Sequence, residues 1–184
     1  MNKLIIDQRK FNGLVSNICR SITNDSWRPD YIVGITRGGL LPAVMISHWL
    51  NVPMQSLDVS LRDNSLCVSN LGMAEDAFGY VSVEDREFTE GEHAAVEARR
   101  NILIVDDIND TGATFNWIMK DWPGGCFPND DTWQSVWGNN VRFAAVVDNL
   151  SSKCDVKMNY CGMEINKAEN NVWIEFPYEE WWSK

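Results

Sequence analysis

Apolar and polar positions alternate along the chain with two periods, one typical of helices and one typical of strands. Apolar side chains recur at three- and four-residue intervals at 11–25, 40–50 and 113–122, which predicts three helices. Short apolar runs predict strands at 31–36, 54–59, 101–105, 143–147 and 172–176. Because these strands alternate with helices, we expect an α/β fold with a mostly parallel sheet and helices on both faces.

Two stretches lack a clear period. Residues 61–100 are polar, acidic and interrupted by glycines, with only weak alternation around 80–83. We interpret them as a long flexible loop, with a hairpin as one form it can take, because long segments without periodicity are typical of lids and mobile loops. Residues 121–140 combine Pro, Gly, Asn and Asp with tryptophans, which predicts an irregular insertion.

The composition is that of one globular domain spanning residues 1–184, with 45% hydrophobic and 23% charged residues. The 26 acidic residues outnumber the 16 basic ones, and the formal net charge is −10. No basic stripe is visible in the sequence, so nucleic acid is excluded as a general partner. A polyanion must therefore be bound locally, by backbone N–H groups, a few cations and a metal ion.

The sequence shows no targeting or membrane-spanning segment. The N-terminal residues contain no long apolar run followed by a cleavage site, and no run of about 18 apolar residues occurs anywhere. Five scattered cysteines without CxxC spacing argue against a disulfide framework and a structural zinc site. We therefore expect a cytoplasmic protein without a membrane partner.

Three carboxylates follow the apolar run at 101–105, at Asp106, Asp107 and Asp110. In an open parallel sheet, ligands bind where loops leave the carboxyl ends of the strands. The helix predicted next begins at the turn formed by Thr111, Gly112, Ala113 and Thr114. Unpaired N–H groups at the start of a helix favour an anion, so we call this turn the phosphate cup. Carboxylates beside such a phosphate cup match a sugar phosphate. A purely solvated acidic loop is the alternative interpretation.

Three motifs resemble those of the type I phosphoribosyltransferases. The run ILIVDDINDTGAT at 102–114 resembles the signature with which this family binds phosphoribosyl pyrophosphate (PRPP). The run ITRGGLLPA at 35–43 resembles the family's pyrophosphate loop. The run VWIEFPYE at 172–179 resembles the base-binding hood of bacterial xanthine–guanine and related 6-oxopurine transferases. The resemblance places the family's flexible catalytic loop at about 61–100 and its small hood at about 160–184.

The resemblance implies transfer of a 5-phosphoribosyl group from PRPP to a nucleobase, with release of pyrophosphate. The base is expected to be a purine, as in nucleotide salvage. Arg37 with the amides of Gly38 and Gly39 would bind pyrophosphate, and the family often has a cis peptide at the pair matched by Arg37 and Gly38. Asp106 and Asp107 would bind the ribose hydroxyls. The polyanion in an acidic protein implies Mg²⁺, which Glu175 would contact through water.

The base would be held by the remaining motif residues. By the same resemblance, Asp110 lies near the imidazole ring of the purine and takes or shares its proton, as a general base. Trp173 would stack on the base, with core packing as the alternative, and the Ile174 backbone would contact the base edge. The family also implies a homodimer or a higher homo-oligomer.

One departure from the family concerns the lysine that contacts the exocyclic oxygen of a 6-oxopurine. This lysine normally ends the penultimate strand, but here the run at 143–147 is followed by Asp148 and Asn149, with no lysine before Lys153. Three interpretations stay open: Lys153 reaches back, Asn149 serves as the donor, or the base is not a 6-oxopurine.

Two other classes of protein compete with an enzyme of this family. A ligand-sensing regulator on the same fold would keep the phosphate cup and lose acidic or hood residues, whereas Asp106, Asp107, Asp110 and Trp173 are all present. Receiver domains and aspartyl phosphatases also place an Asp at a strand end. The phosphatases need a different Asp spacing, however, and receivers lack the phosphate cup.

Overall fold

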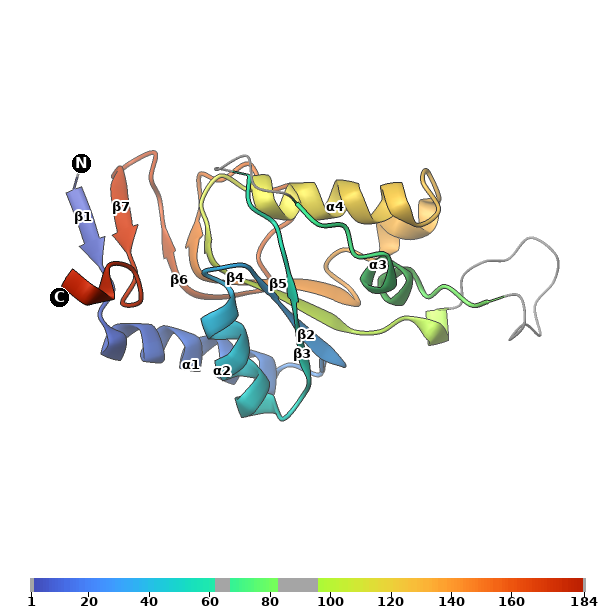
Figure 1. Cartoon of the computed structure of the whole chain (residues 1–184), viewed down its shortest axis with the longest axis horizontal. Coiled ribbons are helices and arrows are strands. Elements are labelled where there is room, and N and C mark those ends of the chain that lie inside the picture. Colours follow the sequence, from blue (N-terminus) through green and yellow to red (C-terminus); the bar gives the residue numbers. More distant parts are fainter. Residues whose placement is uncertain (1, 62–66, 83–95, 184) are drawn as a thin grey trace.

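The computed structural model describes residues 2–61, 67–82 and 96–183, and its centre is a five-stranded sheet (Figure 1). All neighbouring strands of this sheet run parallel, in the order β3-β2-β4-β5-β6. The strands are β2 (Tyr31–Ile35), β3 (Met54–Leu57), β4 (Ile102–Asn109), β5 (Val141–Asn149) and β6 (Tyr160–Ile165). The predicted α/β fold with a parallel sheet is confirmed.

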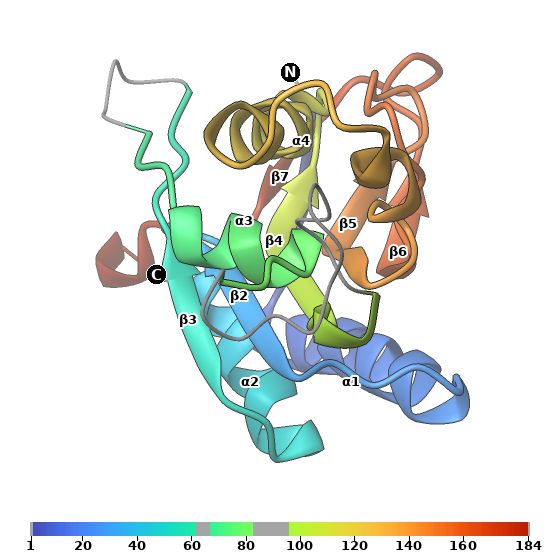
Figure 2. The ribbon, with the colours of Figure 1, turned by 90° about the vertical axis from the view of Figure 1, so that its right-hand side faces the viewer.

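Helices cover both faces of the sheet (Figures 1 and 2). One face carries α1 (Gln8–Asn24) and α2 (Leu40–Leu50), and the other carries α3 (Leu71–Phe78) and α4 (Ala113–Gly125). Strand β2 shows why: Ile32 belongs to the apolar cluster beneath α1 and α2, whereas Tyr31 and Val33 belong to the cluster beneath α3 and α4. Because successive side chains of a strand point to opposite faces, a fully apolar strand serves two cores.

A second, two-stranded sheet joins the two ends of the described chain. Strand β1 (Asn2–Ile5) pairs in parallel with β7 (Val172–Glu175), with Asn2 opposite Val172. Both lie beside the main sheet at the same end of the molecule (Figure 1). The segment predicted as a hood, 160–184, is therefore divided, because Tyr160–Ile165 is the edge strand β6 of the main sheet.

Helix α3 corrects the interpretation of 61–100 as a loop. Asn70 caps this helix by accepting a hydrogen bond from the Met73 N–H at 3.0 Å, and Gly79 ends it in the left-handed conformation. Four of its side chains are buried under α4, at Met73, Ala74, Ala77 and Phe78. Tyr80 follows the helix, and part of the segment in which the hairpin was considered falls outside the described residues. The parts of the predicted loop at 62–66 and 83–95 lie outside the described residues.

The insertion predicted at 121–140 is built around an aromatic cluster. Helix α4 continues to Gly125, and a 3-10 turn follows at Asp131–Ser135. Trp133 is 5% exposed, stacks on Trp137 at 5.5 Å between ring centroids, and donates from Nε1 to the Cys126 carbonyl at 2.9 Å. Further 3-10 turns lie at Val96–Ala98 and Trp181–Ser183. The tryptophans of the insertion thus extend the core instead of forming an exposed loop.

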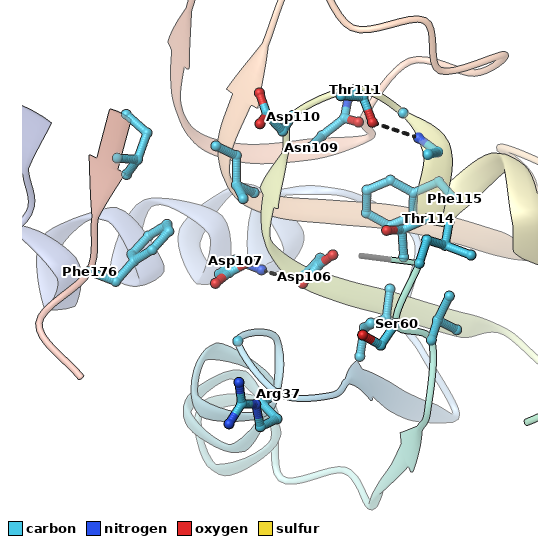
Figure 3. A pocket seen from close by; sticks show the side chains of 18 of the residues that line it. Arg37, Ser60, Asp106, Asp107, Asn109, Asp110, Thr111, Thr114, Phe115 and Phe176 are labelled. Carbon is cyan, nitrogen blue, oxygen red and sulfur yellow. Dashed lines mark hydrogen bonds between the residues drawn. The ribbon is translucent and has the colours of Figure 1, made fainter. Parts of the chain in front are cut away.

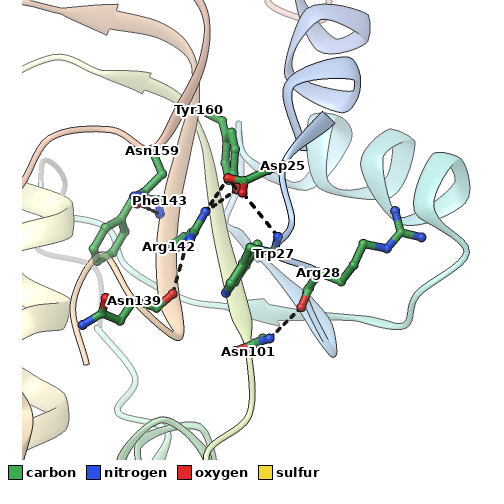
Figure 4. A network of polar contacts seen from close by, with 9 residues as sticks. All are labelled: Asp25, Trp27, Arg28, Asn101, Asn139, Arg142, Phe143, Asn159 and Tyr160. Atoms are coloured by element: carbon green, nitrogen blue, oxygen red, sulfur yellow. Dashed lines mark hydrogen bonds and ion pairs between the residues drawn. The ribbon is translucent and has the colours of Figure 1, made fainter. Parts of the chain in front are cut away.

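A polar network links the C-terminal end of α1 to the amino ends of β5 and β6 (Figure 4). The Asp25 carboxylate accepts hydrogen bonds from the Tyr160 hydroxyl at 2.9 Å and from Arg142 at 2.6 Å, and the Arg142 guanidinium lies 4.7 Å from the Trp27 ring centroid. The Tyr160 hydroxyl and then Arg142 hold the pKa of Asp25 below its ordinary value. The stability that this pair contributes is therefore present above about pH 4 and is lost as the pH falls through the lowered pKa.

Candidate functional site

A cavity of about 330 Å³ opens at the carboxyl ends of β2 and β4, beside the start of α4 and the segment that follows β7 (Figure 3). Its wall includes Asp106, Asp107 and Asp110 together with the whole turn 111–114. The carboxylates and the phosphate cup thus share one cavity, which is the arrangement that the sequence predicted. The alternative of a solvated acidic loop is excluded by this geometry.

Strand β4 extends four residues beyond the predicted strand, which ended at Val105. Asp106 and Asp107 are strand residues and not loop residues, because β4 continues to Asn109 alongside β5. Its pairing with β2 ends earlier, at Gly34 opposite Val105. The two carboxylates therefore lie on the part of β4 that extends beyond its pairing with β2. Asp106 is 9% exposed. The Asp107 N–H donates to Asp106 Oδ1 at 2.9 Å, which fixes the orientation of that carboxylate.

The loop after β2 lies directly against these carboxylates, and two glycines allow it. A Cβ at Gly39 would meet the Ile35 carbonyl at 2.8 Å and the Asp106 Cα at 2.9 Å, and a Cβ at Gly38 would collide with the Asp107 carboxylate. Gly38 lines the cavity, and exposed Arg37 stands at its rim. The cis peptide lies between Thr36 and Arg37, one bond earlier than the resemblance implied.

The phosphate cup is open to solvent. Gly112 adopts a φ of 85° just before α4 begins at Ala113, and it has no side chain with which to cap the helix. Thr111 and Ala113 are exposed, and Thr111 Oγ1 accepts a bond from the Ala113 N–H at 3.3 Å. Because residues 111–114 line the cavity, the N-terminus of α4, which carries a partial positive charge, lies beside it.

Lys167, which the sequence analysis did not single out, enters the cavity wall from the segment after β6. Its Nζ lies 2.8 Å from Asp110 Oδ1, and the two side chains are 16% and 22% exposed. Nothing in the local sequence marks this lysine, because its place depends on how the chain returns from β6. A lysine that the sequence did not point to is thus present in the site, on the turn that follows β6.

The side chains proposed for the missing lysine's role lie elsewhere. Asn149 is 4% exposed and its Nδ2 donates to the Asp110 carbonyl at 2.7 Å, while Lys153 is exposed and contacts Thr111 through its backbone N–H at 3.0 Å. Neither belongs to the described cavity wall. Glu175 accepts a hydrogen bond from Lys3 at 3.0 Å and also lies outside that wall, whereas Glu179 is part of it.

Tyr178 lies in the motif at 172–179 but was not among the predicted site residues. Its hydroxyl donates to Asp107 Oδ2 at 2.7 Å, and its ring stacks on Phe176 at 5.5 Å. Burial, and then the charge of Asp107, raises the pKa of the Tyr178 hydroxyl well above its ordinary value. The hydroxyl therefore stays protonated and acts as a donor that holds the Asp107 carboxylate in place.

Trp173 and Ile174 complete the cavity on the side of β7. Trp173 is 43% exposed, so its ring is not part of the core, and Ile174 is 5% exposed with its side chain in the core beneath α1. An aromatic face left open beside a polar cavity is suited to stacking against a planar ring.

The carboxylates of the cavity fit a magnesium ion that is held chiefly by a ligand. Within 2–61, 67–82 and 96–183, no group of three or more His, Cys, Asp or Glu side chains is arranged to hold a metal. Mg²⁺ is usually bound through one or two carboxylates together with substrate phosphates. Asp106 and Asp107 on the wall supply oxygen donors of this kind.

No helix in the described part of the chain is long and apolar enough to cross a bilayer.

The chain is 26% identical over 156 residues to the xanthine-guanine phosphoribosyltransferase of Cereibacter sphaeroides, covering 85% of this chain and 71% of that protein. It is 24% identical over 128 residues to xanthine phosphoribosyltransferase 1 of Saccharomyces cerevisiae, and the match covers 65% of this chain and 59% of the yeast protein.

Solved structures share the fold. The purine phosphoribosyltransferase of Pyrococcus horikoshii superposes with a TM-score of 0.62 at 20% identity, covering 98% of this chain and 96% of that one. At this identity the likeness concerns the fold alone. The family described as the phosphoribosyl transferase domain matches residues 5–180, nearly the full length of the chain. This protein therefore belongs to the phosphoribosyl transferase domain family.

Proposed function

We propose that this protein transfers the 5-phosphoribosyl group of PRPP to a purine base and releases pyrophosphate. The observation that carries the proposal is the single cavity in which the carboxylates of β4, the start of α4 and the open ring of Trp173 meet. The wall of this cavity offers suitable contacts to a sugar phosphate, to a pyrophosphate and to a planar base.

Each part of PRPP matches one part of the cavity. The 5-phosphate lies in the cup formed by the amides of residues 111–114. The ribose hydroxyls donate to Asp106 and Asp107. Pyrophosphate lies against Arg37 and the amide of Gly38, while Gly39 lets this loop approach β4. Mg²⁺, when bound, would neutralise pyrophosphate as it leaves, with oxygens of Asp106 and Asp107 within its reach.

The reaction exchanges one bond at C1 of the ribose for another. The bond from C1 to the pyrophosphate oxygen breaks and takes its electron pair to the leaving group, and a ring nitrogen of the base then bonds to C1. The base loses a proton in this step, and Asp110 accepts it. Lys167, 2.8 Å from the Asp110 carboxylate, stands beside the atom that gains the proton.

We also propose that the chain acts as a single domain, in the cytoplasm, and as a homodimer or a higher homo-oligomer. All five cysteines are free thiols, which supports a reducing compartment. Leu41, Val44 and Trp49 leave apolar surface exposed on α2, as a subunit contact would require. Light scattering on the purified protein would test the oligomer, and a monomer at micromolar concentration would contradict it.

The proposed function is tested by pyrophosphate release from PRPP and Mg²⁺ in the presence of single bases. The panel of bases consists of guanine, xanthine, hypoxanthine, adenine, uracil and orotate. A reaction without any base serves as the blank. Release with at least one purine and the appearance of the matching nucleotide support the proposal. Tight binding of PRPP without release on any base would instead indicate a sensor on the same fold.

Replacing Tyr178 by Phe is expected to raise the KM for PRPP by about tenfold with a smaller change in kcat. The variant loses the hydrogen bond to Asp107 Oδ2, and hydrogen bonds to charged groups contribute about 1.5–3 kcal/mol. The phenyl ring keeps the stacking on Phe176, so the free energy of unfolding should fall by no more than this contribution. Steady-state kinetics at saturating base measure the effect, and an unchanged KM for PRPP would show that Tyr178 does not position Asp107.

A further inference from the structure

We infer that Asn116 is a positioning residue for PRPP, because it anchors the segment between β5 and β6 that supports the phosphate cup from behind. We call this segment, residues 150–154, the brace. The inference rests on the proposed function and goes beyond it, since it assigns a role in ribose-phosphate binding to residues that lie outside the described cavity wall.

The brace contacts the phosphate cup backbone to backbone. The Lys153 N–H donates to the Thr111 carbonyl at 3.0 Å. Gly112 lies so close to the brace that a Cβ there would be 2.6 Å from the Cys154 Cα and 2.7 Å from the Lys153 carbonyl carbon. Atoms packed this closely cannot shift independently of one another. The brace therefore sets the position of the cup whose amides the 5-phosphate would use.

Asn116 holds the brace from the first turn of α4. Its Nδ2 donates to the Lys153 carbonyl at 2.8 Å, so both backbone groups of Lys153 are bonded to the start of this helix. Asparagine disfavours helix interiors because its side chain competes for backbone hydrogen bonds. Here the Asn116 N–H keeps its helical bond to the Gly112 carbonyl at 3.0 Å, and the side chain bonds to the brace instead.

A second asparagine holds the brace from β4. Asn109 is 3% exposed, and its Nδ2 donates to Asp148 Oδ1 at 2.8 Å and to Ser152 Oγ at 2.9 Å. Asn109 lies beside Thr111 in the wall of the cavity (Figure 3). The brace is thus fixed at two successive residues, at Ser152 by β4 and at Lys153 by α4.

A cup that is already ordered binds an anion more tightly than one that becomes ordered on binding. Several N–H groups have to point at one phosphate, and ordering them when the ligand arrives costs free energy. The anchors of the brace supply this order in the free protein. The pyrophosphate loop after β2 is positioned differently, by its close approach to β4 at Gly38 and Gly39. Loosening the brace should therefore weaken binding at the phosphate cup and leave binding at the pyrophosphate loop unchanged.

The test measures the binding of ribose 5-phosphate and of magnesium pyrophosphate separately, by titration calorimetry. Asn116→Leu keeps a side chain of similar size and loses the donor to Lys153. We expect this variant to bind ribose 5-phosphate about 5–10-fold more weakly, the factor that one hydrogen bond accounts for, and to bind pyrophosphate with unchanged affinity. In steady-state kinetics the KM for PRPP should rise by a similar factor, with kcat nearly unchanged.

Two further variants complete the test. Ser152→Ala removes the acceptor for Asn109 Nδ2, so it should weaken ribose 5-phosphate in the same way, and it carries the test if Asn116→Leu fails to fold. Asn17→Leu is the matched control, because it makes the same substitution at an exposed position of α1. It should leave the binding of both ligands unchanged.

Unchanged binding of ribose 5-phosphate in both brace variants would overturn the inference. An equal loss of both ligands would also overturn it, since that result indicates a general loss of structure. The proposed function fails separately. If the variants weaken ribose 5-phosphate alone but no base releases pyrophosphate from PRPP, the brace is supported and phosphoribosyl transfer is refuted. If pyrophosphate is released with the same KM for PRPP in the unaltered protein and both variants, transfer is supported and the inference is wrong.

Discussion

Replacing Asp110 by Asn is expected to slow phosphoribosyl transfer by about 10²–10⁴-fold while the protein still folds, since this is the range over which general-base assistance contributes. In the proposed reaction, the Asp110 carboxylate accepts the proton that the base loses. An amide of the same size cannot accept it. The new side chain still offers an oxygen to Lys167 Nζ, which now lies 2.8 Å from Asp110 Oδ1, so the pair keeps a hydrogen bond and loses its charge.

The measurement is kcat at saturating PRPP and base, with PRPP binding measured alongside by calorimetry. Binding should be nearly unchanged, because the phosphate cup and the ribose-binding carboxylates are untouched. Asp155→Asn is the control, since it makes the same chemical change at an exposed residue between β5 and β6 that is outside the described cavity wall. Full turnover in the Asp110 variant would remove Asp110 from the role of general base.

The main strands and helices were predictable because each of them is apolar over its full length or along one face. Strand β4 is the clearest case: Ile102 to Val105 are all 0% exposed, and a strand with helices on both faces has no polar side. The motif after it placed Asp106, Asp107 and the turn 111–114 in one cavity correctly, because the ends of parallel strands meet at one edge of the sheet.

The elements that were missed have weaker local signals. Strand β6 is covered chiefly by α1, so its positions are mixed in polarity, and Gly162 interrupts it where a Cβ would meet the Leu14 Cβ at 2.8 Å. Strand β1 is largely exposed and finds its partner at the far end of the chain, with Lys3 opposite Trp173. Helix α3 did carry signals, in the cap at Asn70 and the stop at Gly79, but it is only eight residues long.

The lysine that lies in the cavity could not be chosen from sequence, because its placement depends on how the chain returns from β6. Lys153 is the first lysine after β5 and was the natural candidate, yet its backbone packs against the phosphate cup and its side chain is exposed. Lys167 comes 14 positions later; its side chain pairs directly with Asp110, and Asn149 bonds to the backbone of both residues. Sequence order carries no information about such a return of the chain.

Replacing Gly112 by Ala is expected to lower the free energy of unfolding by about 2–5 kcal/mol and to abolish tight PRPP binding. Gly112 has a φ of 85°, which an alanine adopts only with strain. The added Cβ would also lie 2.6 Å from the Cys154 Cα and 2.7 Å from the Lys153 carbonyl carbon. These are backbone atoms, so no rotation of a side chain relieves the contact, and the cup or the segment at 153–154 must move.

Urea unfolding and PRPP calorimetry separate the two parts of this expectation. Gly13→Ala is the control, because a Cβ at Gly13 meets nothing within 4 Å in the middle of α1, and the change should raise stability by about 0.5–1 kcal/mol. If Gly112→Ala loses stability but binds PRPP normally, the turn before α4 serves only the fold. The 5-phosphate of PRPP then binds elsewhere. If it keeps its stability and loses PRPP, the amides of this turn bind the phosphate even though the backbone can accommodate the methyl group.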